Sequence, residues 1–179
     1  MNALEKRSVV ALASVYAMRM LGLFMVMPVF VLLGTDLQGA TPALLGLAIG
    51  AYGLSQALLQ IPFGLLSDRV GRKRMIYLGL ILFACGSLLA ASTDSIYVVI
   101  AGRILQGAGA IASVLMAPLS DLTREEERTK AMATVGISIG LSFSVSLVLG
   151  PLLGAAWGLS GIFYVTAVMA LLALVVVAR

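Results

Sequence analysis

Gly64-Leu-Leu-Ser-Asp-Arg-Val-Gly-Arg-Lys-Arg74 is a short, charged segment flanked by glycines, and it is the most informative part of the sequence. Four cations and one carboxylate lie between Asp68 and Arg74, although only 11% of the chain is charged. An apolar run long enough to cross a bilayer stands on each side of this stretch. Because moving these charges through lipid is costly, the stretch holds one end of both flanking helices at one water interface.

The composition as a whole indicates a protein that lies in lipid. Of the 179 residues, 61% are hydrophobic, whereas soluble domains contain about 45–50%. The net charge is +4, but the basic residues form short clusters between apolar runs without interleaved aromatic residues. This pattern sets membrane orientation and argues against a nucleic-acid partner. With no histidine and only Cys85 as cysteine, disulfides within the chain and His-based or paired-Cys metal or haem sites are excluded, and no cofactor is expected.

The spacing of the apolar runs predicts six membrane-spanning helices. A spanning helix needs about 20 mainly apolar residues. The first run continues to about Leu33, which is too long for a secretory signal peptide. We therefore predict an all-α polytopic membrane protein in which residues 1–179 form a single bundle, with helices over 9–33, 42–66, 75–91, 96–119, 131–157 and 160–178.

The positions of lysine and arginine predict the orientation of this bundle. The opposite loops contain only Asp36 and Asp94 as charged residues, and the positive-inside rule then places both termini in the cytoplasm. The basic residues outside the spans all fall on one side: Lys6, Arg7, Arg69, Arg72, Lys73, Arg74, Arg124, Arg128, Lys130 and Arg179.

Polar side chains inside the predicted spans mark a candidate cavity. Such groups must face other helices or water, because lipid cannot satisfy them. The candidates for cavity lining and coupling are Arg19, Tyr52, Gln56, Arg103 and Gln106. An alternative reading is that the two arginines extend to the nearest interface and only anchor their helices.

A weak internal similarity predicts a three-plus-three inverted repeat. Arg19-Met-Leu-Gly22 in the first helix is similar to Arg103-Ile-Leu-Gln-Gly107 in the fourth. Because three is odd, two three-helix units in one chain have opposite membrane orientations.

These motifs together resemble those of the major facilitator superfamily. The opening stretch matches that family's loop 2–3 signature at Gly64, Asp68, Arg69, Gly71, Arg72 and Lys73. Arg103, Gln106 and Gly107 are similar to its fourth-helix motif. Gly140, Gly150, Pro151 and Gly154 partly resemble the fifth-helix motif of its drug/proton antiporter branch.

The resemblance implies a secondary transporter that works by alternating access and exports small molecules, with protons as the coupling ion. Asp68 is the candidate carboxylate of a conformational switch, paired with Arg72 or, through a shared arginine, with Asp121. The alternative for this stretch is a solvated turn that only sets topology. Gly150-Pro151 is expected to bend the fifth helix.

The resemblance also implies partners and a location. The expected partners are the lipid bilayer, a small-molecule substrate and a second six-helix bundle, supplied by a missing half or by a second copy. The expected location is the bacterial inner membrane. The chain is then a fragment or a half-sized transporter. The alternative function is a membrane scaffold or assembly partner that keeps the fold without transport. An enzyme is not expected, because no nucleophile–base pair or metal set can be assembled.

Overall fold

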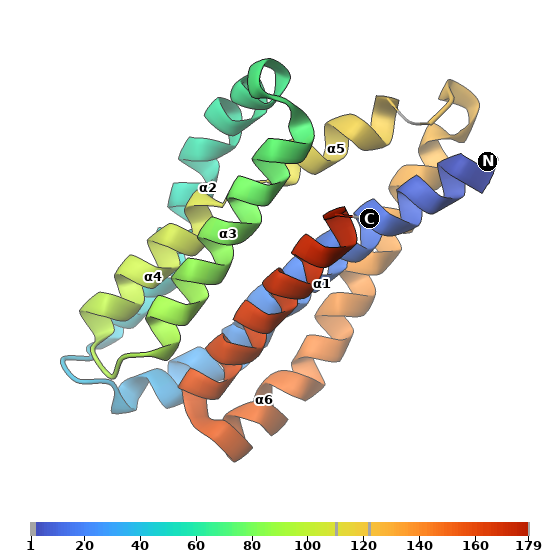
Figure 1. Ribbon diagram of the computed structural model, residues 1–179. Helices are drawn as coiled ribbons and strands as arrows, with labels where there is room; N and C mark the ends of the chain where they lie inside the picture. Colours follow the sequence, from blue (N-terminus) through green and yellow to red (C-terminus); the bar gives the residue numbers. More distant parts are fainter. Residues whose placement is uncertain (1–2, 110, 122, 179) are drawn as a thin grey trace.

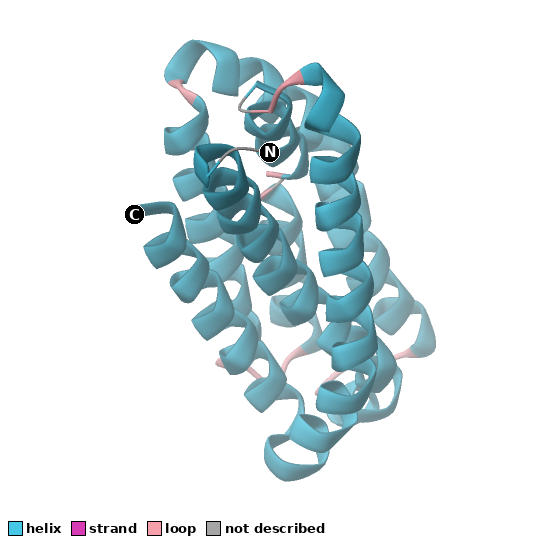
Figure 2. Cartoon of the chain, turned by 90° about the vertical axis from the view of Figure 1, so that its right-hand side faces the viewer, coloured by secondary structure: helices cyan, strands magenta, loops and turns pink. Residues whose placement is uncertain are grey.

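The computed structural model describes residues 3–109, 111–121 and 123–178, and its regular elements there are all helical. The predicted all-α class is confirmed. Figures 1 and 2 show long helices that run roughly along one direction, with the two marked ends of the chain in the same half of the molecule. The elements are α1 (Ala3–Leu33), the short 3-10 helix η1 (Gly34–Asp36), α2 (Pro42–Val70), α3 (Arg72–Ala91), α4 (Ile96–Ala108), α5 (Ala112–Asp121) and α6 (Glu125–Ala178).

Local sequence explains how α2 begins. Thr41 is extended, with φ −132° and ψ 157°, and its hydroxyl accepts a hydrogen bond from the backbone N–H of Leu44 at 3.2 Å. Pro42 occupies the first turn, where a missing N–H costs nothing. The helix therefore starts where the sequence predicts.

The predicted helices 42–66 and 75–91 leave residues 67–74 between them, but in the structure all of these residues except Gly71 are helical. Only Gly71 separates α2 from α3, with a φ of 104° that favours glycine. Its N–H donates to the Ser67 carbonyl at 3.0 Å, and its own carbonyl accepts from the Met75 N–H at 3.2 Å. Helical hydrogen bonding thus extends to both sides of this glycine, and two helix ends carry the charges.

The helix predicted over 96–119 is divided in the structure, because α4 ends at Ala108 and α5 begins at Ala112, although Ile96–Met116 together counts as one candidate membrane span. A Cβ atom on Gly109 would lie 2.3 Å from the carbonyl oxygen of Gly79 on α3, so the two backbones meet here. The Ile111 N–H donates to the Gly109 carbonyl at 2.8 Å.

The 54 residues of α6 form two arms rather than one straight rod. At about 1.5 Å per residue a straight helix of this length would measure roughly 80 Å, far more than the roughly 30 Å hydrocarbon core of a bilayer. Gly158 interrupts it with φ 66° and ψ −169°, and Figure 1 shows the chain turning back there. The first arm (residues 125–157) and the second arm (159–178) therefore run antiparallel.

The two ends of the bundle differ in charge. At one end the Gln38 N–H donates to the Asp94 carbonyl at 2.7 Å, so the α1–α2 and α3–α4 connections meet. At the other end Arg72 contacts Asp121, and Arg124 contacts Glu5 at 3.0 Å. We call this second end, with the starts of α1, α3 and α6, the basic end.

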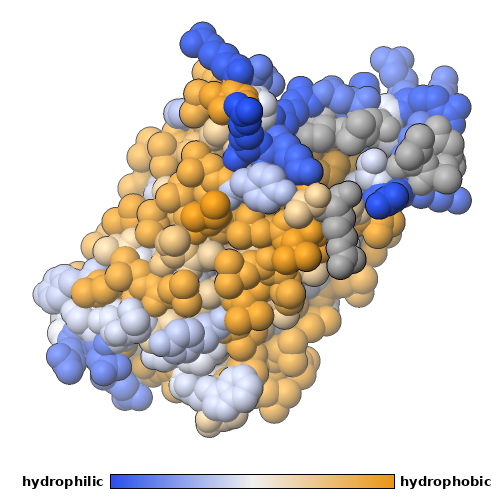
Figure 3. All heavy atoms as spheres, viewed as in Figure 1, coloured by the Kyte–Doolittle hydropathy of each residue, from blue (hydrophilic) through white to orange (hydrophobic). Residues whose placement is uncertain are grey.

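The surface between the ends is apolar. Large side chains such as Leu58, Ile61, Leu141 and Val148 are more than half exposed. Figure 3 shows hydrophilic residues gathered along the upper edge and at the lower left, with a hydrophobic belt between them. Five helices of the described chain are long and apolar enough to cross a membrane: Glu5–Asp36, Pro42–Val70, Arg72–Ala91, Ile96–Met116 and Glu125–Ala178. The chain is a multi-pass membrane protein.

Candidate functional site

Arg103 is buried in the middle of the bundle, with 1% of its surface exposed. Its Nη1 donates to Oε1 of Gln106 at 2.8 Å, and its Nε donates to the Ala48 carbonyl at 3.4 Å. Its guanidinium carbon lies 4.7 Å from the centre of the Tyr52 ring, a cation–π contact. The side chain points into the protein, so the alternative of an arginine extended to the nearest interface is wrong for Arg103 in this structure.

Gln106 extends this hydrogen-bond network to α3. Its amide nitrogen donates to the hydroxyl of Ser87 at 2.7 Å, and that hydroxyl donates to the Phe83 carbonyl at 2.7 Å. Both Gln106 and Ser87 are fully buried. The side chains of Arg103, Gln106 and Ser87 are thus linked by hydrogen bonds from α4 to α3, which compensates for the burial of these polar groups.

Close backbone contact allows the network to form. A Cβ atom on Gly107 would lie 2.0 Å from the Ser55 hydroxyl and 2.3 Å from the Tyr52 carbonyl oxygen. Glycine at this position lets α4 approach α2 until Arg103 reaches the Tyr52 ring. Gly107, predicted from the fourth-helix motif, thus lies at the contact between these helices.

Arg19 joins α1 to the same tyrosine. Its Nη2 is placed to donate to the Tyr52 hydroxyl at 3.2 Å and to Oε1 of Gln56 at 3.3 Å. Its guanidinium carbon lies 5.4 Å from the centre of the Phe83 ring. Arg19 is 1% exposed, so it too is buried and does not extend to an interface.

Arg19 differs from Arg103 in how many of its nitrogen atoms have a hydrogen-bond partner. Its Nε and Nη1 atoms are buried and have no hydrogen-bond partner among the described residues. The sequence contains no carboxylate between Glu5 and Asp36, between Asp36 and Asp68, or between Asp94 and Asp121. Two cations therefore lie beside Tyr52 without an acidic partner nearby in the sequence. We call Arg19, Tyr52, Gln56, Arg103 and Gln106 the buried arginine cluster.

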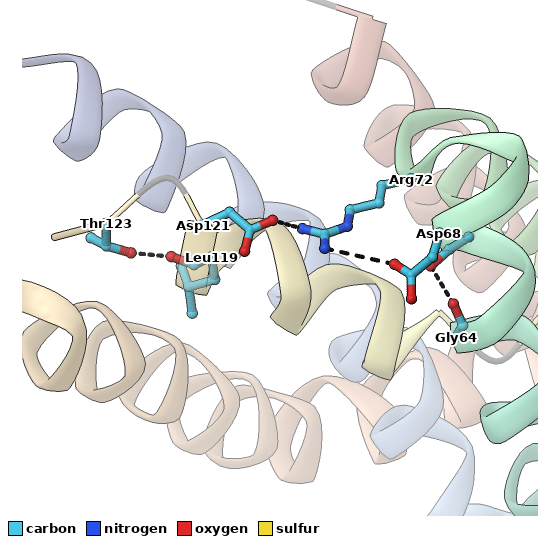
Figure 4. Close-up of polar contacts among 7 residues, drawn as sticks. Gly64, Asp68, Arg72, Leu119, Asp121 and Thr123 are labelled. Atoms are coloured by element: carbon cyan, nitrogen blue, oxygen red, sulfur yellow. Dashed lines mark hydrogen bonds and ion pairs between the residues drawn. The ribbon is translucent and has the colours of Figure 1, made fainter. Parts of the chain in front are cut away.

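A second group of polar side chains lies at the basic end (Figure 4). Arg72 contacts the carboxylate of Asp121 through Nη1, and its Nη2 lies 3.7 Å from Oδ1 of Asp68. One guanidinium thus lies between a carboxylate from the end of α2 and one from the end of α5. We call Asp68, Arg72 and Asp121 the basic-end triad.

The remaining residues of the loop 2–3 signature have other positions. Arg69 and Lys73 are exposed. Gly64 lies beside α5, where an added Cβ atom would be 3.5 Å from the Ser113 hydroxyl. Gly71 supplies the positive φ between the helices. The signature therefore brings its acidic residue and Arg72 together, and it leaves Arg69 and Lys73 on the surface.

The fifth-helix candidates lie in the first arm of α6. A Cβ atom on Gly150 would lie 2.6 Å from the Met25 carbonyl oxygen, and one on Gly154 would lie 3.0 Å from the Leu33 side chain. Both glycines thus allow close packing against α1. Gly140 has open space beside it, and Pro151 lies inside the helix.

The sequence reading missed two polar features of the site. Ser87 was not predicted because the apolar part of α3, residues 75–91, lacks charged and amide side chains, yet the close packing of its neighbour Gly86 against α4 places it beside Gln106. The pair between Glu5 and Arg124 joins residues 119 positions apart, and sequence spacing carries no signal for it. The hydrogen bond to Glu5 raises the pKa of Arg124 above its ordinary value.

Comparison with known proteins identifies the family. These elements define a polytopic helical membrane protein with a buried polar interior, the class to which membrane transporters belong. The profile of the Major Facilitator Superfamily matches residues 12–179, and the chain belongs to this superfamily. The resemblance predicted from the motifs is confirmed.

Several relatives carry transporter names. The chain is 55% identical over 166 residues to the inner membrane transport protein YajR of Escherichia coli (strain K12). The aligned region covers 93% of this chain and 37% of that protein. It is 35% identical over 156 residues to multidrug resistance protein 2 of Bacillus subtilis (strain 168), covering 84% of this chain and 37% of that protein. The chain thus spans well under half the length of either relative.

A solved structure has the same fold. The human organic anion transporter MFSD10 (TETRAN) superposes with a TM-score of 0.79 at 21% sequence identity, covering 98% of this chain and 47% of that one. This similarity supports the arrangement of the helices.

Proposed function

We propose that this chain forms one six-crossing bundle of a secondary transporter that works by alternating access. The turn at Gly158 supplies a fifth and a sixth crossing from α6, and α4 with α5 supplies the fourth. The crossings divide into three-plus-three inverted repeats, with Arg19 and Arg103 at matching places in the first helix of each. The basic end faces the cytoplasm of a bacterial inner membrane, and both termini lie on that side.

The buried arginine cluster is the observation that carries this proposal. An arginine near the middle of a membrane helix costs about 2.5–3.5 kcal/mol on insertion scales, and such residues mark substrate or ion pathways. Here two of them share Tyr52, and two buried nitrogen atoms of Arg19 have no hydrogen-bond partner within the described part of the chain. These atoms are suited to bind a hydrogen-bond acceptor or an anionic group of a transported compound.

A second six-helix bundle completes the pathway in this proposal. The relatives are more than twice as long as the matched region. The exposed apolar residues of α2 and of the first arm of α6, among them Leu54, Leu58, Ile137 and Leu141, give a second bundle a surface to pack on. Rocking of the two bundles then exposes the cluster to each side in turn.

The basic-end triad is the proposed conformational switch. It ties the ends of α2 and α3 to the end of α5, so a movement that separates these ends must break it. A contact made in one state and lost in the other shifts the equilibrium between the two states.

The proposed substrate is a small, amphipathic compound that is exported in exchange for protons. The name of the Bacillus subtilis relative supports export of toxic compounds. The sequence contains no carboxylate between Asp36 and Asp68 or between Asp94 and Asp121. In this proposal the second bundle therefore supplies the proton site.

Resistance measurements test the proposal. Cells that express the longest form encoded by the gene are challenged with a panel of toxic amphipathic compounds. Wild type is expected to raise the inhibitory concentration of at least one, and Arg103→Ala to abolish the gain. Ile104→Ala is the matched control, because Ile104 is 47% exposed beside the buried Arg103.

The alternative function is a scaffold that keeps the fold without transport. It is favoured if no compound in the panel distinguishes wild type from an empty vector. It is also favoured if Arg103→Ala, expressed at the wild-type level, retains the full gain in resistance.

A further inference from the structure

A groove with a volume of about 530 Å³ opens at the basic end, between α1, the start of α3 and the last turns of α6. Its walls are mostly apolar and include Ala11, Ile76 and Val177. Arg72 and Lys73 lie at its rim. We call it the α1–α3–α6 groove.

The two cations at the rim have different surroundings. Arg72 contacts Asp121, which also lines the groove, and lies 3.7 Å from Asp68, so its charge is balanced. Lys73 is exposed and forms no hydrogen bond or ion pair that is seen within the described part of the chain. Lys73 is therefore the free cation of this groove.

The groove lies at the boundary between water and lipid. The α3 helix and the second arm of α6 expose apolar side chains such as Leu78, Ile81 and Leu171. The charged rim belongs to the end that carries most of the basic residues. A ligand of the groove thus meets a cation at its polar end and hydrocarbon along its length.

We propose that the α1–α3–α6 groove binds an anionic membrane phospholipid. Its phosphate pairs with the ammonium group of Lys73, and an acyl chain lies along Ile76 and Val177. A soluble anion would gain nothing from the apolar walls, and an apolar chain without a headgroup would gain nothing from Lys73. The two features together fit an amphiphile that the surrounding membrane supplies in excess.

A neighbouring groove provides an internal comparison. It has a volume of about 630 Å³ and lies on the other side of the contact between α1 and α6, with Ala11 and Val176 in both linings. Lys6 and Arg7 lie at its rim. Removal of Lys6 therefore takes one positive charge from the same end of the molecule without touching the α1–α3–α6 groove.

Native mass spectrometry tests the proposal. The protein, in the longest form encoded by the gene, is reconstituted with equal amounts of phosphatidylglycerol and phosphatidylcholine, and the lipids that it retains are counted. Wild type is expected to retain phosphatidylglycerol preferentially. Lys73→Gln should remove most of this preference, because it takes away the cation that pairs with the phosphate, whereas Lys6→Gln should leave most of it.

A second pair of variants tests the apolar part of the groove. Val177→Trp fills the space along the wall and should reduce retention of both lipids. Leu171→Trp places the same side chain on an exposed position of the same arm, outside the lining, and should not.

Three results would overturn the proposal. In the first, Lys6→Gln weakens the preference as much as Lys73→Gln, which indicates only general surface attraction. In the second, a folded Val177→Trp variant retains as much lipid as wild type. In the third, wild type shows no preference for phosphatidylglycerol, as expected if another part of the protein fills the groove. If Val177→Trp fails to fold, the comparison of Lys73→Gln with Lys6→Gln still decides the question.

Discussion

The guanidinium of Arg72, at the start of α3, contacts the carboxylate of Asp121, 49 positions further along the chain at the end of α5. This contact connects the loop 2–3 signature to a part of the bundle that the signature does not contain. The side chains are 32% and 60% exposed, so water and salt screen the pair. The contact therefore adds little stability, and its main effect is to join the start of α3 to the end of α5.

The first prediction concerns the stability that this contact contributes. Asp121→Asn removes the charge and keeps the size of the side chain. Because exposed ion pairs contribute roughly 0–1 kcal/mol, the free energy of unfolding should fall by less than about 1 kcal/mol. Thermal unfolding of the purified protein in detergent measures this. A fall of several kcal/mol would show that the contact supports the fold itself.

The second prediction concerns the contact between α2 and α4. Gly107→Ala places a Cβ atom against the backbone of Tyr52, which cannot yield as a flexible side chain can. Overpacking of this kind costs about 1–3 kcal/mol, and the apparent melting temperature should fall. Gly53→Ala is the control, because nothing lies within 4 Å of the atom that it adds. Equal stability of both variants would contradict the close approach of α4 to α2.

The third prediction concerns the turn inside α6. Gly158 has φ 66° and ψ −169°, a conformation that is almost confined to glycine. Gly158→Ala should therefore destabilise the protein by about 1–3 kcal/mol. Gly140→Ala, in the first arm of the same helix and with open space beside it, should be neutral or slightly stabilising. A neutral Gly158→Ala would argue against the turn.

The fourth prediction concerns topology. In a Cys85→Ala background, single cysteines at Arg74, Asp94 and Trp157 are labelled with a membrane-impermeant thiol reagent; all three native residues are exposed. Six crossings place Asp94→Cys and Trp157→Cys in one compartment and Arg74→Cys in the other. Labelling of Trp157→Cys from the same side as Arg74→Cys would show that α6 does not cross the membrane twice.

The helices were largely predictable from sequence, because hydrophobic runs bounded by charges or turn residues determine where a chain crosses lipid. The turn at Gly158 falls in the predicted gap between 157 and 160. The interruption at Gly109 was not predictable, because its cause is the approach of Gly79 from another helix. Composition alone gives no sign of such a contact.

The candidate site, like the fold, was only partly predictable from sequence. The polarity of Arg19 and Arg103 in an apolar setting indicates that each needs a buried partner. Their common partner, Tyr52, follows only from the packing of α1, α2 and α4. The three-residue spacing of Arg103 and Gln106 places them on one helix face, and their hydrogen bond uses that spacing.

The proposed alternating access around the buried arginine cluster can be tested by the accessibility of a cysteine at Gln56. In a Cys85→Ala background, the Gln56→Cys protein, in the longest form encoded by the gene, is exposed to an impermeant maleimide from either side of the membrane. We expect reaction from both sides. We also expect Asp121→Asn to speed reaction from the basic end, because an ion pair joining elements at that end resists its opening. Reaction from one side only, at a rate that Asp121→Asn leaves unchanged, would contradict the proposed transport cycle.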